Sequence, residues 1–114
     1  MEWVKLFASY YRDPKILALP DADAEMLFVR SLGYSGEQET GGFIPEHALP
    51  ALTRRRRYAN SVAALEAQNL WTRVDGGWQI TRWHDRQEEL EKLAARRTAD
   101  RERKRRQRAA EASK

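Results

Sequence analysis

Apolar residues recur along the first part of the chain at two spacings, one typical of helices and one typical of strands. The clearest helical pattern follows Asp21 and Asp23, either of which is suited to cap the start of a helix. Gly33 and Gly36 weaken the end of this helix, and a polar loop is expected over 36–42. The inward stripe recurs every three or four residues and consists of Ala24, Leu27, Phe28 and Leu32.

Two short elements precede this helix. Residues 3–6 alternate poorly and predict either a short strand or an extended lead. Asp13-Pro14 predicts a helix start, because Asp caps well and Pro is favoured at the first helical position. The resulting helix over 14–19 is short, and its expected inward residues are Ile16, Leu17 and Leu19.

Two further short elements follow the polar loop. The apolar stretch 43–45 lies between turn residues and predicts a minimal strand. A two-turn helix is expected over 46–52, with Pro50 early in it, where a missing N–H costs little. The residues expected to face inward in this helix are Ala48, Leu49 and Leu52.

A β-hairpin is expected beyond residue 70. The segments 70–74 and 78–81 alternate apolar with polar residues and flank Asp75-Gly76-Gly77. Asp-Gly between two such segments indicates a tight turn, because both residues tolerate positive φ. Trp71, Trp78 and Trp83 are expected to pack this hairpin back onto the helices.

The order of the expected elements is helix, helix, short strand, helix, turn, helix, hairpin, long helix. This order predicts a mainly α fold with a small β-wing, a winged helix-turn-helix followed by a long C-terminal helix. In such folds the second helix of the turn motif enters the major groove and the hairpin is the wing. We expect a DNA-binding domain over 1–84 and a basic helical arm over 85–114 that is frayed or disordered at its end.

The second helix of the turn motif is expected over 57–68, and Asn69 suits the left-handed position just past its end. At 100° per residue, its inward side contains Tyr58, Val62 and Leu65 together with small residues. Side chains of the opposite side are able to bind base edges or phosphates. That side consists of Arg57, Asn60, Ser61, Ala64 and Gln68.

Four consecutive arginines, Arg54, Arg55, Arg56 and Arg57, occupy the turn before this helix and its N-terminal end. Adjacent guanidinium groups repel one another, so a phosphate-binding role explains the cluster better than a role in folding. A basic patch that binds an acidic protein is the competing interpretation. Arg73 precedes the wing tip, where it is either a DNA contact or an ordinary exposed strand residue.

The chain from Asp85 onward contains neither Gly nor Pro and is rich in good helix formers. With so few apolar residues it has little to pack against, and phosphates are the expected partner of its cations. Leu90 and Leu93 are too few for a stable coiled coil. RNA is the competing polyanion, since basic arms also fold on RNA. The cations in question are Arg96, Arg97, Arg101, Arg103, Lys104, Arg105, Arg106 and Arg108.

Composition sharpens the division between the two parts. Residues 96–114 contain nine Lys or Arg and three Asp or Glu, a net charge of +6, whereas residues 1–95 sum to −2. Every Trp, Tyr and Phe lies within the first 83 residues. The chain has no cysteine and no long apolar run, so disulfides, thiolate metal sites and membrane spans are not expected. A cytoplasmic protein is the default expectation.

No catalytic constellation, metal site or cofactor motif is expected. His47 and His84 lack any metal-ligand spacing, and the acidic run 21–25 is explained by helix capping. Ser9, Ser31 and Ser61 lack the context of a catalytic nucleophile. The sequence therefore favours a binding protein over an enzyme.

Several short segments over about residues 3–86 together carry a family resemblance. The chain resembles the winged-helix domains of actinobacterial phage and mobile-element proteins that bind DNA or initiate replication, the replisome-organiser-like proteins. The resemblance implies DNA binding more firmly than replication, and Asn69 stands where family members often have Gly. The segments are Trp3-Val4-Lys5-Leu6, Asp13-Pro14-Lys15-Ile16, Gly42-Phe43-Ile44-Pro45, Leu49-Pro50-Ala51-Leu52, Leu65-Glu66-Ala67-Gln68-Asn69-Leu70-Trp71 and Asp75-Gly76-Gly77-Trp78.

The leading expectation is sequence-preferring binding to double-stranded DNA in replication initiation or transcriptional regulation, with replisome or transcription proteins as further partners. The sequence leaves open whether the protein forms a homodimer. A protein–protein adaptor for an acidic partner and an RNA-binding accessory protein are the alternatives.

Overall fold

The protein is described from a computed structural model that covers residues 2–112. Residues 2–7 belong to no helix or strand, and they are followed by the 3-10 helix η1 (Ala8–Arg12), which the sequence pattern did not predict. Helix α1 (Pro14–Leu17) begins where expected, because the Asp13 carboxylate accepts the Lys15 N–H at 2.9 Å. Its inward side is narrower than expected. Ile16 is buried, but Leu17 is 67% exposed, since so short a helix turns only one face to the body.

Helix α2 (Ala22–Gln38) is the central helix of the body. Asp21 caps it by accepting the Ala24 N–H at 2.9 Å, and all four residues of the predicted stripe are buried. The helix runs through Gly33 and Gly36, so the loop expected over 36–42 begins only after Gln38. The cost of about 1 kcal/mol for each helical glycine is offset at Gly36, which is buried against the body.

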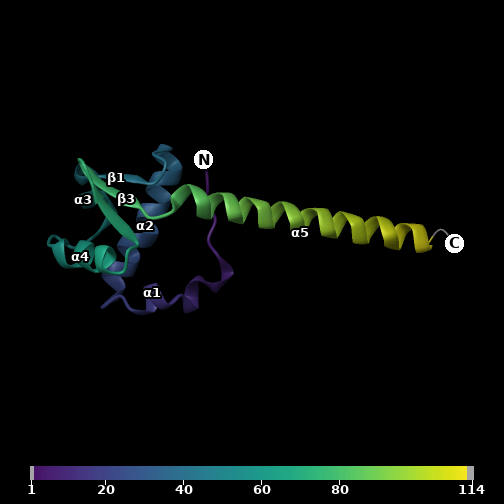
Figure 1. Cartoon of the computed structure of the whole chain (residues 1–114), viewed down its shortest axis with the longest axis horizontal. Coiled ribbons are helices and arrows are strands. Elements are labelled where there is room, and N and C mark those ends of the chain that lie inside the picture. The colour runs from purple at the N-terminus through teal and green to yellow at the C-terminus, as the bar shows by residue number, and fades with distance from the viewer. Residues whose placement is uncertain (1, 113–114) are drawn as a thin grey trace.

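Three short strands form an antiparallel sheet beside these helices. The predicted hairpin consists of β2 (Trp71–Val74) and β3 (Gly77–Ile80), joined by a turn with Gly76 at φ 81°. The predicted minimal strand, β1 (Phe43–Pro45), pairs with β3 and places that strand in the middle of the sheet. Figure 1 shows the sheet beside α2, with its hairpin at the end of the body away from the start of α5.

The helix expected over 46–52 is a 3-10 turn, η2 (Glu46–Ala48), that continues into α3 (Leu49–Leu52), with its three predicted inward residues buried. Helix α4 (Ala59–Ala67) begins two residues later than predicted and ends one residue earlier. Asn69 has φ 57°, which confirms the left-handed position expected just past its end.

One hydrophobic core joins α2, α3, α4 and the sheet. Leu27, Ile44, Leu49 and Leu65 are almost fully buried within it. Trp71 and Trp78 lie with ring centroids 5.5 Å apart, and Trp83 closes the core at the start of the last helix. The expected packing of these tryptophans against the body is therefore confirmed.

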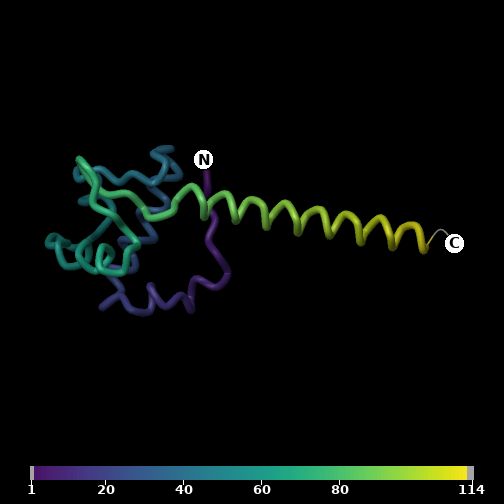
Figure 2. Tube along the Cα trace, viewed as in Figure 1, coloured from purple at the N-terminus to yellow at the C-terminus, as the bar shows by residue number. Residues whose placement is uncertain are grey.

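Helix α5 (Trp83–Ala112) begins two residues before the expected position and projects far beyond the body (Figures 1 and 2). The molecule measures 67 × 27 × 22 Å with a radius of gyration of 18.5 Å, against about 13 Å for a compact domain of this length. The helix is continuous to Ala112, and residues 113 and 114 of the expected arm lie outside the described residues. Fraying or disorder at the end of the arm stays a prediction. Within residues 2–112, no helix is both long and apolar enough to cross a bilayer.

Candidate nucleic-acid interface

The four arginines of the predicted phosphate-binding cluster lie in the connection between α3 and α4, and all are exposed. Arg55 differs from the others because its guanidinium pairs with Asp23 at 3.1 Å and with Asp21 at 3.5 Å. It therefore ties this connection to the start of α2, a folding role that the sequence argument had not assigned to any member of the cluster. Exposed ion pairs of this kind contribute about 1 kcal/mol or less.

The other three members of the cluster keep their charge unneutralised. Arg54, Arg56 and Arg57 make no hydrogen bond or ion pair with their side chains in the described part of the chain. They directly precede the N-terminal end of α4, where the helix dipole adds to the positive potential. The sequence pattern had predicted Arg57 on the first turn of the helix, but this residue lies before the helix.

The exposed face of α4 is rotated by one residue from the predicted face. Its inward stripe is Tyr58, Ser61, Val62 and Leu65, the three-and-four spacing that buries one side of a helix. The exposed residues of this helix are Ala59, Asn60, Ala63, Glu66 and Ala67. The three alanines at intervals of four are the pattern in the sequence that could have marked this face.

Ser61 is the clear error in the predicted recognition face. It is 1% exposed, and its hydroxyl has no hydrogen-bond partner among the described residues. A serine is small enough to occupy a core position, so its polarity misplaced it in the sequence argument. Asn60 is exposed as predicted, and Gln68 is half-buried at the C-terminal cap of the helix.

Glu66 lies at the border of the alanine face. Its carboxylate accepts the indole N–H of Trp78 at 2.8 Å, which directs the negative charge toward the sheet. The outward face of α4 is therefore small, weakly polar and bordered by arginines at its N-terminal end.

Arg73 of β2 has two partners inside the protein. Its guanidinium forms an ion pair with Glu46 and lies over the ring of Trp78, 4.6 Å from the centroid. These contacts join the hairpin to η2 and offset the charge of Arg73. Of its two predicted roles, that of a strand residue has the contacts to support it.

The basic half of α5 does not pack against the body of the protein, because every described residue from 95 onward is exposed. Arg103 pairs with Asp100 at 3.1 Å, and the Arg101 Nε–H donates to the Arg97 carbonyl at 3.4 Å. At 100° per residue, five of its cations fall within roughly a 100° sector. This sector, here called the basic stripe, consists of Arg97, Arg101, Lys104, Arg105 and Arg108.

The two basic surfaces lie at opposite ends of the molecule. Figures 1 and 2 show α4 at the end of the body remote from the C-terminal end of α5. Among the described residues, no cluster of three His, Asp or Glu side chains could bind a metal ion. Comparison of the chain with family models, characterised proteins and solved structures finds no match.

Proposed function

We propose that the protein binds double-stranded DNA through the α3–α4 connection and the outward face of α4, and that the basic half of α5 adds non-specific contacts. The observation that carries the proposal is a group of three guanidiniums that are unpaired within residues 2–112, next to a helix face with small side chains: those of Arg54, Arg56 and Arg57. Arginine side chains bind phosphate oxygens through paired hydrogen bonds.

The order of elements supports the same proposal. A helix, a strand, a two-helix turn and a hairpin follow one another, and the strand before the turn joins the hairpin as a third strand. This order agrees with the winged-helix arrangement that the family resemblance implies, and the proposal therefore assigns α4 to the major groove. A role in replication initiation or transcriptional regulation belongs to this proposal, with replisome or transcription proteins as further partners.

Each residue of the face then has a separate role. The alanines allow the helix backbone to approach the floor of the groove, and Asn60 is the side chain placed to bind an adenine edge. Gln68 lies at the other end of the helix, where it reaches the groove only at its border. Base recognition therefore depends mainly on Asn60, and affinity depends on the arginines.

The hairpin contributes less than the helix. Arg73 is offset by Glu46, and Asp75 at the tip carries a negative charge that phosphates repel. The proposal therefore assigns DNA affinity to the segment 54–57 and to α5, with β2 and β3 acting mainly as the support of α4.

The first test removes two of the unpaired charges. Arg56→Ala with Arg57→Ala should weaken duplex binding at least about tenfold and lower the magnitude of the salt slope by about 2. Arg12→Ala with Arg30→Ala is the matched control, because it removes two exposed cations elsewhere. Fluorescence anisotropy on random and selected duplexes gives both values. Equal affinities for the two double variants would refute the assignment.

The second test separates adjacent positions on α4. Asn60→Ala should lower the preference for the selected duplex by about 1–3 kcal/mol, while Ser61→Ala should leave both affinity and preference unchanged. The selected duplex comes from in vitro selection by the purified protein. Loss of preference in Ser61→Ala alone would contradict the observed orientation of the helix. Tighter binding of the protein to structured RNA than to duplex DNA of equal length would favour an RNA partner.

A further inference from the structure

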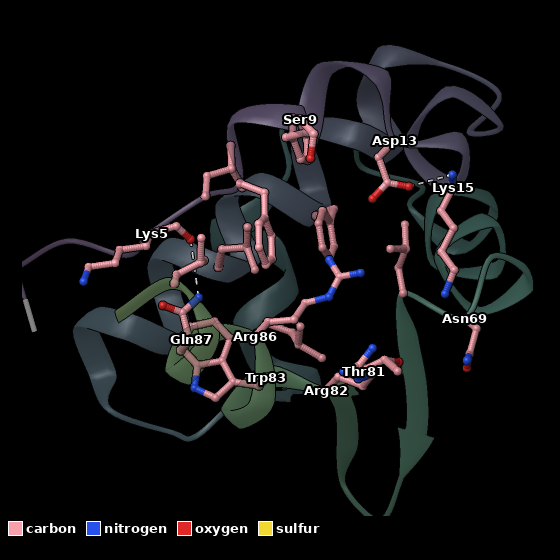
Figure 3. A pocket seen from close by; sticks show the side chains of 18 residues that line it. Lys5, Ser9, Asp13, Lys15, Asn69, Thr81, Arg82, Trp83, Arg86 and Gln87 are labelled. Atoms are coloured by element: carbon pink, nitrogen blue, oxygen red, sulfur yellow. Dashed lines mark hydrogen bonds between the residues drawn. The ribbon is translucent and has the colours of Figure 1, made fainter. Parts of the chain in front are cut away.

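A cavity of about 310 Å³ lies between the N-terminal segment 5–15 and the body of the protein. Its walls come from α2, from the open end of the hairpin, where β2 begins and β3 ends, and from the first turns of α5, as the close view in Figure 3 shows. This volume is within the range of small-molecule sites in proteins. Neither the basic stripe nor the arginine cluster contributes a residue to it.

The lining of the cavity is apolar on most sides. Phe28, Leu32 and Ile80 line it from the body, and Phe7 and Leu90 line it from the N-terminal segment and α5. Such walls exclude water from a bound apolar group and favour its burial. The cavity therefore suits a ligand whose main part is a ring or a short hydrocarbon chain.

The guanidinium of Arg86 lies inside this space without a partner among the described residues. The Arg86 side chain extends into the cavity in Figure 3, is half-buried, and makes no ion pair or hydrogen bond through its guanidinium within residues 2–112. Its neighbour Arg82 is exposed and is paired with Asp85 and Glu89 at 3.8 Å each. A guanidinium held in partly apolar surroundings without a counter-charge favours the arrival of an anion.

The carboxylate in the lining of the cavity does not pair with Arg86. Asp13 is the single carboxylate that lines the cavity, and its Oδ1 is occupied by the Lys15 N–H as the cap of α1. The Tyr10 hydroxyl is also engaged, because it donates to Glu25 at 3.3 Å. Lys5 and Lys15 also line the cavity, but the Arg86 guanidinium is the cation that lies at its centre in Figure 3.

We propose that this cavity binds a small organic carboxylate with one or two rings, whose carboxylate pairs with Arg86 and whose rings contact the apolar walls. This site is separate from the proposed DNA-binding surfaces, and its existence does not depend on them. A ligand held there would touch both the N-terminal segment and α5. A hydrogen bond joins these two segments, in which the Gln87 side-chain amide donates to the Lys5 carbonyl at 3.4 Å.

The test uses 2-naphthoate as the probe and the uncharged 2-naphthylmethanol as its analogue, each titrated into the full chain by calorimetry. We expect saturable binding of one naphthoate per chain and binding of the alcohol at least about tenfold weaker, because a charge-assisted hydrogen bond is lost. The change in chemical shift of the Trp83 indole N–H resonance as the probe is added locates the probe, since Trp83 lines the cavity.

Two matched variants decide the role of the guanidinium. Arg86→Gln should weaken naphthoate binding at least about tenfold and leave the alcohol unaffected, while Arg30→Gln, which removes an exposed cation that does not line this cavity, should change neither by more than about twofold. Unaltered thermal unfolding of both variants shows that the fold is intact. Absence of saturable naphthoate binding, equal affinity for the alcohol, or undiminished binding by Arg86→Gln would each overturn the proposal.

Discussion

At the scale of single residues, the closest packing occurs where β1 meets β3. Gly77 pairs with Pro45 across the two strands and is buried there. A Cβ atom at this position would overlap the Ile44 carbonyl and lie 2.9 Å from the Pro45 Cα, both of which are backbone atoms. Backbone cannot move aside as a flexible side chain does, so the third strand depends on this glycine.

Gly77→Ala should therefore lower the free energy of unfolding by about 3 kcal/mol, the upper end of overpacking effects. Gly33→Ala is the control, because Gly33 lies within α2 with no heavy atom within 4 Å of an added Cβ. It should raise stability by about 0.5–1 kcal/mol through its better helix propensity. Urea unfolding measures both, and equal effects would contradict the packing described for β1 and β3.

Tyr10 provides a residue-scale dependence of stability on pH. Burial, and then the negative charge of Glu25, raise the pKa of the Tyr10 phenol well above its ordinary value of 10.0. In the unfolded chain the phenol loses its proton near its ordinary pKa, whereas in the folded protein it keeps it. Above that pH the folded state binds more protons than the unfolded state, so stability falls as pH rises.

The stabilising effect of the neutral phenol should thus be complete below about pH 10 and decrease above it. Tyr10→Phe retains the ring but not the titrating group, so its stability should decline less steeply between about pH 9 and pH 11. Urea midpoints measured across this range for both proteins give the comparison. Parallel curves would show that Tyr10 does not keep its proton in the folded state.

At the scale of elements, α4 and α5 present contrasting surfaces. The nine-residue α4 has one buried side and one alanine-rich side, so its orientation is set by packing against α2 and the sheet. The second half of α5 has no packed side, and the distribution of its charge is set by sequence spacing alone. The basic stripe follows from that spacing and extends about 17 Å along the helix, at 1.5 Å per residue from Arg97 to Arg108.

The stripe predicts that cations of α5 contribute unequally to DNA binding. Arg97, Arg101 and Arg105 changed together to Gln should lower the magnitude of the salt slope by about 3. Arg96, Arg103 and Arg106, which carry equal charge but lie outside the stripe, should lower it by less than about 1 when changed to Gln. Affinity measured over a range of salt concentrations tests this, and equal decreases would show that the helix has no preferred DNA-binding face.

Deletion of residues 96–114 gives the related prediction for the whole arm. If about six of its cations contact phosphates, the deletion should lower the magnitude of the salt slope by about 5. Preference for a selected duplex should persist, because Asn60 and the arginine cluster are retained. Loss of that preference would contradict the separation of roles between α4 and α5.

At the scale of the whole molecule, the length of the protein limits how it can occupy one duplex. The molecule is 67 Å long, and its two basic surfaces lie toward opposite ends. With a rise of 3.4 Å per base pair, this length corresponds to about 20 base pairs. A shorter duplex that is bound at α4 therefore cannot extend along the full arm.

Affinity should accordingly increase when a single selected site is embedded in a duplex of about 30 rather than about 12 base pairs. The increase should vanish in the chain lacking 96–114, which serves as the control. Anisotropy with labelled duplexes of both lengths measures it. A length dependence that is the same with and without the arm would mean that α5 does not contact the DNA that α4 binds.

Local structure was largely predictable from the sequence because its causes are local. The carboxylates of Asp13 and Asp21 cap helices within three residues of themselves, and Asn69 adopts its left-handed conformation from its own side-chain chemistry. The turn at Asp75-Gly76 and the charge of the arm depend likewise on neighbouring residues only. These features required no knowledge of what packs against them.

The tertiary structure alone decided which surfaces remain available. Ser61 is buried because Val62 and Leu65 set the rotation of α4, and an amino acid as small as serine is tolerated on either side of a helix. Arg55 is paired because the start of α2 lies beside the α3–α4 connection, and Arg86 faces a cavity built from segments distant in sequence. Burial and pairing of charge depend on contacts between remote parts of the chain, which spacing along one segment does not encode.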